Sequence, residues 1–207
     1  IKLGADSVTI HLREDRRHIN DLDTKKICAL NKVLVNLEVS MNNEIIKKAL
    51  RYKPNYICIV PEKRKEVTTE GGLNLKKKKI FLKKMISKIK KNKIRVSLFI
   101  EPKISDVQIA KNLGADCIEL HTGKYCNLFN LKKNTKKEFS KIKNAAGYAI
   151  KKSLEVHAGH GLSYKTAYNI SKIKNIAEFN IGHFIVSESL FVGLKKVILK
   201  FKKIIDN

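Results

Sequence analysis

The stretch LGADSVTIH at residues 3–11 has a near copy, LGADCIELH, at residues 113–121. Each copy joins a Leu-Gly-Ala-Asp turn to five residues in which polar and apolar side chains alternate, a pattern typical of a β-strand. The apolar spacing of residues 107–112 predicts a helix before the second copy. By analogy, we expect a strand and a helix to precede the first copy, ahead of residue 1.

Seven apolar segments predict β-strands. They lie at residues 7–12, 33–40, 56–60, 95–100, 117–121, 154–158 and 178–181. The stretches between them have apolar residues at helical spacing, as at Phe81, Met85 and Ile89. This alternation predicts one α/β domain over residues 1–207 with a parallel sheet. With the expected preceding unit there are eight units, the number that closes a (β/α)8 TIM barrel. We therefore predict a barrel whose first strand and helix are absent from this chain; an open seven-stranded sheet is the alternative.

The composition is that of a globular and strongly basic protein, with 43% hydrophobic residues and a net charge of +25. Six of the 44 basic residues are arginines, which leaves 38 lysines, and we interpret most of these as solvated helix faces. A polyanion-binding surface is the alternative. Because lysine is the usual cation here, we expect the arginines at positions 13, 16 and 17 to do what an ammonium group cannot.

Other features of the sequence concern location. No apolar run approaches the ~20 residues that span a bilayer, and no signal-peptide pattern stands at the start, so we expect a cytoplasmic protein without membrane association. Cys28, Cys58, Cys117 and Cys126 form no Cys-x-x-Cys pair. Cys58 and Cys117 lie in apolar runs, where we expect buried, unreactive thiols that suit a reducing compartment.

Histidines and carboxylates gather where a barrel places its active site, at the carboxyl ends of strands. All six histidines follow predicted strands: His11, His18, His121, His157, His160 and His183. Strand alternation points Thr9 with His11, Asn36 with Glu38, and Glu119 with His121 toward the barrel interior. An inward carboxylate in a partly dehydrated pocket has a raised pKa, as a general acid or base near neutral pH requires. A buried carboxylate satisfied by a neighbouring arginine is the alternative.

Two glycine-bearing stretches follow the last two predicted strands: HAGHGLSY at residues 157–164 and FNIGH at residues 179–183. Phosphate-binding loops are common at these positions of a barrel, since glycine lets backbone N–H groups approach an anion. The sequence contains no His-Glu-x-x-His or comparable metal-binding spacing. No lysine lies at a strand end as an obvious Schiff-base nucleophile.

The motifs resemble one family, the pyridoxine 5'-phosphate synthases of the deoxyxylulose-dependent route to vitamin B6. The resemblance rests on GADSVTIHLREDRRHI (4–19), NLEVS (36–40), VPEKRKEVTTEGGLNL (60–75), VSLFI (96–100), IELHTGKY (118–125), HAGHGLSY (157–164) and NIGH (180–183). It implies a (β/α)8 barrel, often assembled as an octamer. It also implies condensation of 1-deoxy-D-xylulose 5-phosphate with 3-amino-2-oxopropyl phosphate, with release of phosphate and water. No metal or organic cofactor is implied.

The resemblance also assigns roles to residues. It makes His11 and Glu38 proton acceptors, His160 the proton donor and Glu119 a group that stabilises the transition state. The positions that hold deoxyxylulose phosphate are Arg13, His18 and Thr68, and those that hold the aminoketone phosphate are Gly161, Gly182 and His183.

Some residues depart from the family's pattern. His157 stands where asparagine is common, and residues 187–189, Ser-Glu-Ser, replace a stretch that usually contains glycine and arginine. The expected preceding unit carries an asparagine, an Asp-His pair and an arginine in the family, which puts the activity of the chain as given in doubt. Two other functions stay open: another phosphosugar enzyme of the barrel class, such as an isomerase or aldolase, and an inactive, lysine-rich remnant that binds polyanions. On the synthase interpretation, nucleic-acid binding is expected to be weak and non-specific.

Overall fold

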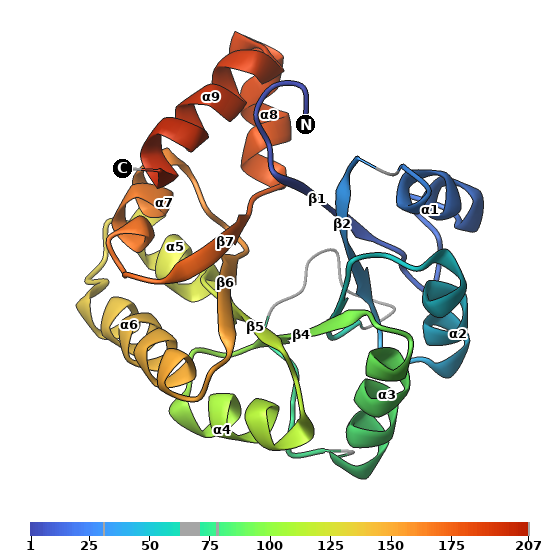
Figure 1. Cartoon of the computed structure of the whole chain (residues 1–207). Coiled ribbons are helices and arrows are strands. Elements are labelled where there is room, and N and C mark those ends of the chain that lie inside the picture. Colours follow the sequence, from blue (N-terminus) through green and yellow to red (C-terminus); the bar gives the residue numbers. More distant parts are fainter. Residues whose placement is uncertain (31, 63–70, 78, 207) are drawn as a thin grey trace.

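Seven parallel strands form one sheet in the order β1-β2-β3-β4-β5-β6-β7, so each strand lies beside its neighbour in sequence (Figure 1). The computed structural model describes residues 1–30, 32–62, 71–77 and 79–206. The strands are β1 (Ser7–His11), β2 (Leu34–Val39), β3 (Tyr56–Ile59), β4 (Arg95–Ile100), β5 (Cys117–His121), β6 (Glu155–Gly159) and β7 (Ile176–Asn180). The helices are α1 (Asp21–Cys28), α2 (Asn43–Tyr52), α3 (Lys79–Lys91), α4 (Ile104–Leu113), α5 (Gly123–Asn130), α6 (Lys136–Lys151), α7 (Tyr164–Ser171), α8 (His183–Val192) and α9 (Leu194–Ile205).

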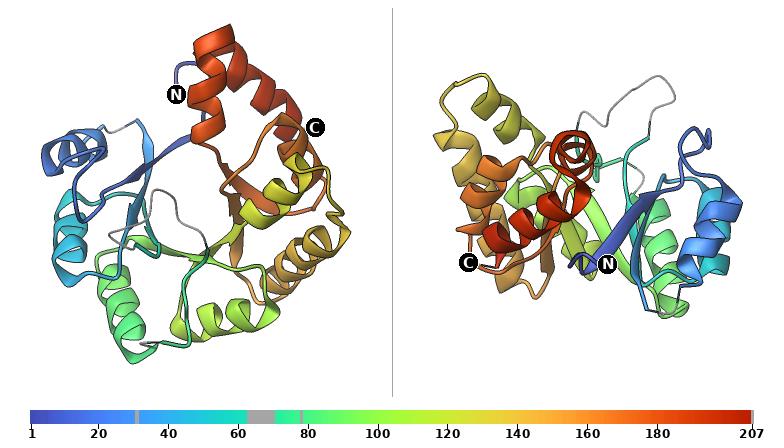
Figure 2. Two further views of the ribbon diagram at one scale, coloured as in Figure 1. Left: turned by 180° about the vertical axis from the view of Figure 1, so that it is seen from behind. Right: turned by 90° about the horizontal axis from the view of Figure 1, so that it is seen from above.

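The sheet curls into a barrel with the helices on its outside, as the views in Figures 1 and 2 show. Among the described residues, no backbone ladder joins β1 to β7. Two side-chain hydrogen bonds cross between these strands instead, Ser7 Oγ to Glu178 Oε2 at 3.4 Å and Thr9 Oγ1 to Asn180 Oδ1 at 2.7 Å. The predicted parallel barrel of TIM type is therefore confirmed, and its first and last described strands are not joined by a backbone ladder.

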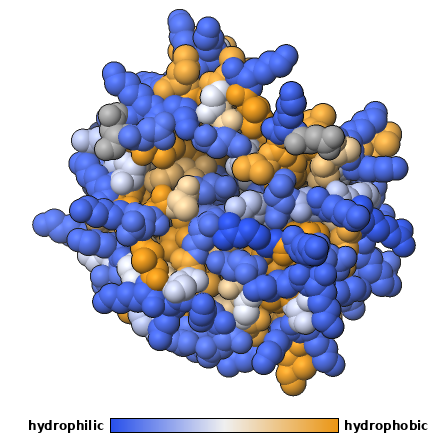
Figure 3. All heavy atoms as spheres, in the orientation of Figure 1, coloured by the Kyte–Doolittle hydropathy of each residue, from blue (hydrophilic) through white to orange (hydrophobic). Residues whose placement is uncertain are grey.

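The hydrophobic core fills the layer between the sheet and the helices. Alternate strand residues such as Leu37, Leu98 and Leu120 are fully buried there, and α3 contributes Leu82 and Ile86. Burial of each such side chain stabilises the fold by about 1.5–3 kcal/mol. The lysines of α3 lie on its exposed face, and Figure 3 shows hydrophilic side chains all round the outline of the molecule rather than over one element. This arrangement agrees with the interpretation of the lysines as solvated.

The two Leu-Gly-Ala-Asp turns have equivalent geometry. Gly4 and Gly114 both have a positive φ, 106° and 89°, which favours glycine. The aspartate that follows each turn pairs with a lysine of a neighbouring helix, Asp6 with Lys202 at 3.0 Å and Asp116 with Lys90 at 2.7 Å. The sequence repeat thus marks a repeated turn at the entrance to a strand, as predicted.

The predicted bounds of β4 and β5 are confirmed, and those of the other strands differ by one or two residues. The largest shift is at β7, which begins at Ile176 rather than at residue 178. No described helix is long and apolar enough to cross a membrane.

Candidate active site

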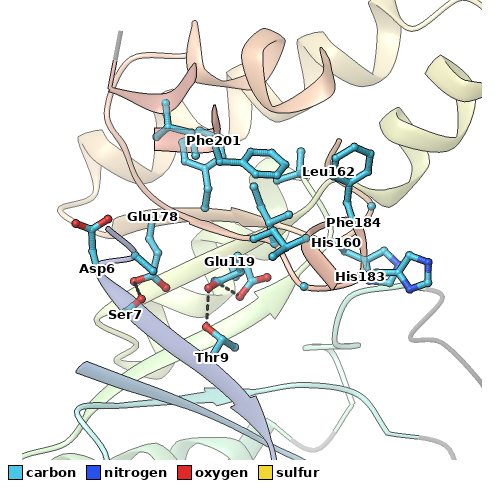
Figure 4. A pocket seen from close by; sticks show the side chains of 18 of the residues that line it. Asp6, Ser7, Thr9, Glu119, His160, Leu162, Glu178, His183, Phe184 and Phe201 are labelled. Atoms are coloured by element: carbon cyan, nitrogen blue, oxygen red, sulfur yellow. Dashed lines mark hydrogen bonds between the residues drawn. The ribbon is translucent and has the colours of Figure 1, made fainter. Parts of the chain in front are cut away.

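A cavity of about 930 Å³ lies in the barrel, and its lining extends from Ser7 at the start of β1 to His160 and His183 beyond the carboxyl ends of β6 and β7. Seven of the residues singled out from the sequence line it: His11, Glu38, Glu119, His160, Gly161, Gly182 and His183. Figure 4 shows several of them together, with the cavity continuing between β1 and the helix α9. The strands bring most of these residues to one place because they lie at or just after a strand's carboxyl end, whereas Glu119 points into the barrel from the middle of β5.

His11 stands between two carboxylates. It lies directly opposite Glu38 in the ladder between β1 and β2, with Nδ1 3.6 Å from Glu38 Oε2. Its Nε2 is 3.4 Å from Glu62 Oε2. Burial, followed by the positive charges of Arg13 and His18, lowers the pKa of His11 to about 4, whereas burial raises the pKa of Glu38 to about 7. At neutral pH His11 is therefore neutral and able to accept a proton, and Glu38 exists in both forms.

Glu119 lies deepest, with only 2% of its surface exposed. Asn180 Nδ2 donates to its Oε2 at 2.9 Å, and the Cys58 thiol donates to the same oxygen at 3.9 Å. Burial and the nearby Glu38 and Glu178 raise the pKa of Glu119 well above its usual value. The other carboxyl oxygen, Oε1, packs closely against Gly159, where an added Cβ would lie 2.0 Å from it. This packing restricts the position of Oε1.

His160 and His121 form a second group across the cavity. Their ring centroids are 4.9 Å apart, and burial together with His121 lowers the pKa of His160. Glu101 Oε1 lies 3.0 Å from His121 Nδ1 and also accepts the backbone N–H of Gly72 at 2.8 Å. His160 has a φ of 76°, in the left-handed region that is rare for a residue with a Cβ.

The three arginines after β1 have different surroundings. Arg16 donates to the carbonyls of Arg13 and Glu14, each at 2.8 Å, and pairs with Asp21 at 3.0 Å, so it holds the loop together. Arg17 is exposed and pairs with Asp15 at 2.6 Å. Arg13 is buried beside His11, with its Nη2 3.8 Å from Glu62 Oε1 and without a hydrogen-bond partner among the described residues. Arg13 thus has a buried donor beside His11 for which the described residues supply no acceptor.

The residues predicted to hold deoxyxylulose phosphate, Arg13, His18 and Thr68, are not among the described residues that line the cavity. His18 is exposed in the loop after β1. Thr68 lies outside the described residues. Arg13 and His18 are nonetheless near the site, since both contribute to the lowered pKa of His11.

A helix N-terminus faces the cavity at the other predicted phosphate position. Gly182 is the N-cap of α8, His183 is its first residue, and neither a side-chain cap nor an acidic residue occupies this first turn. Gly161 has a φ of 81°, and a Cβ there would approach Cys126 Cβ to 3.1 Å. The free N–H groups and the partial positive charge of a helix N-terminus suit a bound anion.

Three residues of the site were missed in the sequence: Glu62, Glu101 and Asn180. A signal existed for each. Glu101 follows β4 directly, Glu62 lies three residues after the end of β3, and Asn180 ends β7 on the same face as Glu178. The rule that placed the histidines at strand ends applies equally to these side chains.

Known proteins resemble this chain over its whole length. The family described as pyridoxal phosphate biosynthesis protein PdxJ matches residues 1–207. A pyridoxine 5'-phosphate synthase of Pelagibacter ubique is 61% identical over 204 residues, which are 99% of this chain and 85% of that protein. One from Campylobacter fetus is 48% identical, over 98% of this chain and 86% of that protein. Among solved structures, 3-keto-L-gulonate-6-phosphate decarboxylase of Vibrio cholerae shares the fold alone, with a TM-score of 0.69, 9% identity, and coverage of 96% of this chain and 85% of that one.

Proposed function

Because the chain belongs to the PdxJ family of pyridoxal phosphate biosynthesis proteins, we propose that it is an enzyme that forms pyridoxine 5'-phosphate. Its substrates in this proposal are 1-deoxy-D-xylulose 5-phosphate and 3-amino-2-oxopropyl phosphate, and phosphate and water are released as the pyridine ring closes. The observation that supports this most directly is the convergence of His11, Glu38, Glu119 and His160 on one cavity. Ring closure requires repeated proton transfers among positioned groups, and in this proposal His11, Glu38 and His160 supply them beside Glu119.

The electrostatics of the cavity suit the proposed roles. His11 and Glu38 accept protons, because a neutral imidazole and a carboxyl with a pKa of about 7 both have basic forms at neutral pH. Glu119, held by Asn180 at 2.9 Å, stabilises the transition state. His160 donates a proton, and a dianionic phosphate nearby raises the population of its charged form by Coulomb attraction.

Two cationic or N–H-rich regions flank these groups, one for each phosphorylated substrate. Arg13 and His18, with Thr68 in the same role, bind deoxyxylulose phosphate; the unused Nη2 of Arg13 supports this part of the proposal. Gly161, Gly182 and His183 bind the aminoketone phosphate at the N-terminus of α8. The reaction proposed here uses no metal or organic cofactor.

The function is tested by supplying the purified chain with both substrates and measuring pyridoxine 5'-phosphate by chromatography and phosphate by a coupled assay. We expect the two products in equal amounts and none when either substrate is omitted. A folded protein that binds both substrates and forms no pyridoxine 5'-phosphate would contradict the proposal.

We also propose that the protein is a cytoplasmic homo-oligomer. Helix α8 supports self-association, because none of its residues is buried and its side chains Val186, Leu190 and Phe191 are 67%, 82% and 84% exposed. The four free cysteines suit a reducing compartment. Sedimentation is expected to show an oligomer that Leu190→Glu disrupts, while Leu131→Glu, at an exposed leucine after α5, leaves it intact. A monomeric protein would contradict this part.

A further inference from the structure

A second polar cluster lies inside the barrel at the amino-terminal ends of the strands, below the proposed active site. Cys117 is the first residue of β5, Glu155 is the first residue of β6, and the two are partners in the ladder between these strands. His157 follows two residues later on the same face of β6. Within the described ranges, no other set of three His, Cys, Asp or Glu side chains brings its ligand atoms so close together.

The distances in this cluster suit a metal ion. Cys117 Sγ is 3.8 Å and His157 Nε2 is 2.8 Å from Glu155 Oε1, and all three atoms lie within 4.8 Å of one another. A tetrahedral Zn²⁺ with bonds of about 2.3 Å to sulfur and about 2.0–2.2 Å to nitrogen and oxygen holds its ligands roughly 3.3–3.8 Å apart. Small side-chain rotations therefore suffice to bring the three atoms to bonding distance of one ion.

The surroundings of His157 point to the same use. Its Nδ1 faces Glu178 Oε1 at 3.6 Å, and both atoms are buried without a hydrogen-bond partner among the described residues. A metal-bound histidine commonly donates its second ring N–H to such a carboxylate, which fixes the ring. Arg95 Nη2 holds the other oxygen of Glu155 at 2.8 Å, and Ser7 Oγ donates to the other oxygen of Glu178 at 3.4 Å.

The charges balance when a divalent ion is added. The Cys117 thiolate, Glu155 and Glu178 carry three negative charges, which Arg95 and a divalent cation neutralise. An ion can reach the cluster from the amino-terminal face, where the side chains of Arg95 and Glu155 are 43% and 30% exposed. The donor set of one sulfur, one imidazole nitrogen and one carboxylate favours zinc and its neighbours over magnesium or calcium.

We propose that Cys117, Glu155 and His157 bind one divalent transition-metal ion of the zinc class, with water completing its coordination. The ion joins β5 to β6 beneath the catalytic groups and takes no part in the reaction. The sequence does not reveal the site by spacing, because Cys117 and Glu155 lie 38 positions apart and only the barrel brings them together. Cys117 is buried, as expected, and the proposal adds a role as a metal ligand for this thiol.

Cobalt provides the test, since a Co²⁺ thiolate has a near-ultraviolet charge-transfer band that carboxylate or histidine ligation alone does not give. Tag-free protein, stripped with a chelator and dialysed, is titrated with Co²⁺ and then with Zn²⁺. We expect one Co²⁺ per chain with the thiolate band, and loss of the band as Zn²⁺ displaces it. Absence of the band from the unaltered protein would overturn the proposal, whatever the enzyme assay shows.

Variants identify the ligands, with folding checked by circular dichroism. Cys117→Ser is expected to abolish the band, and Glu155→Gln to weaken Co²⁺ binding about 10- to 100-fold. Cys58→Ser is the matched control, since Cys58 is also a buried strand thiol with a carboxylate at 3.9 Å but without a histidine completing a metal cluster. A band that survives in Cys117→Ser or Glu155→Gln at full affinity, or one that disappears in Cys58→Ser, would overturn the assignment.

Discussion

Thr9 and Asn180, 171 residues apart, are hydrogen-bonded side chain to side chain at 2.7 Å between the first and last strands of the sheet. The same Asn180 donates its amide N–H to Glu119 at 2.9 Å. One side chain therefore spans the open edge of the barrel and orients a carboxyl group of the proposed active site. This relationship makes Asn180 a positioning residue, which acts through Glu119.

Replacement of Asn180 by leucine is expected to lower kcat about 10- to 100-fold, because Glu119 loses the hydrogen bond that orients it. KM for either substrate should change little, since Asn180 holds no phosphate in the proposal. Thr9→Val, which keeps the shape but removes the hydroxyl donor, should have a smaller effect of the same kind. Steady-state kinetics with each substrate varied distinguishes these outcomes. A defect confined to KM would show that Asn180 binds substrate instead.

Glu38→Gln keeps the shape of the side chain and removes the base, so kcat should fall by about 10²–10⁴-fold. The pH dependence provides a second readout. Burial raises the pKa of Glu38 to about 7, so the basic form is lost, and kcat falls, as the pH drops through that value. This decline should be absent from the residual activity of the variant. Calorimetry should show substrate binding nearly unchanged; near-normal turnover would rule out Glu38 as the base.

Arg13→Lys keeps the positive charge but loses the planar fork that fits a phosphate. We expect KM for deoxyxylulose phosphate to rise about tenfold, a loss near that of one charged hydrogen bond, with kcat less affected. Arg17→Lys is the matched control, because Arg17 is exposed and pairs only with Asp15 in the described part of the chain. If Arg13→Lys changes only kcat, Arg13 is not the phosphate ligand.

Gly159→Ala tests the packing behind Glu119. The added Cβ would lie 2.0 Å from Glu119 Oε1, so either the strand or the carboxyl group must move. We expect a loss of about 1–3 kcal/mol in the free energy of unfolding, as for overpacked cores, together with a strong loss of kcat. Gly147→Ala in α6 meets no atom within 4 Å and should stabilise the protein by about 0.5–1 kcal/mol. Denaturant unfolding measures both, and a fully active Gly159→Ala would contradict the packing argument.

The hydrogen bond between Glu101 and His121 predicts a pH-dependent part of the stability. The hydrogen bond to His121 lowers the pKa of Glu101 from 4.5 to about 2. Because the folded-state pKa is the lower one, the contribution is present above pH 4.5 and is lost as the pH falls toward 2. The free energy of unfolding of the unaltered protein should therefore exceed that of Glu101→Gln by about 1–3 kcal/mol at pH 6. This difference in stability should become smaller as the pH falls from 4.5 toward 2. A difference that grows over this range would contradict the lowered pKa of Glu101.

Local rules made part of the site predictable. Alternation along a strand placed Glu38 and Glu119 inside the barrel, and the strand-end rule placed His11 and His160 beside them. These rules say which face a side chain is on, but not which side chain it meets across the barrel. The contact of Asn180 with Thr9, and that of His121 with Glu101, depend on how the sheet curls.

The arginines illustrate the same limit. Their concentration after β1 was visible in the sequence, and all three were expected to have roles that lysine cannot fill. Only the structure separates Arg16, whose guanidinium satisfies two backbone carbonyls and Asp21, from Arg13, whose Nη2 is unused. Which acceptors a guanidinium group reaches depends on the path of the loop. No periodicity in the sequence encodes that path.

The left-handed backbone of His160 has a consequence for how the protein can change. Seven described residues other than glycine have a positive φ, and of these His160 alone lines the cavity. A residue with a Cβ in this region costs about 1–3 kcal/mol, which glycine avoids. The fold would therefore be more robust with glycine at position 160, and would lose its proposed proton donor. Laboratory selection for thermal tolerance without a demand for turnover should remove this histidine, so stability and activity compete at one residue.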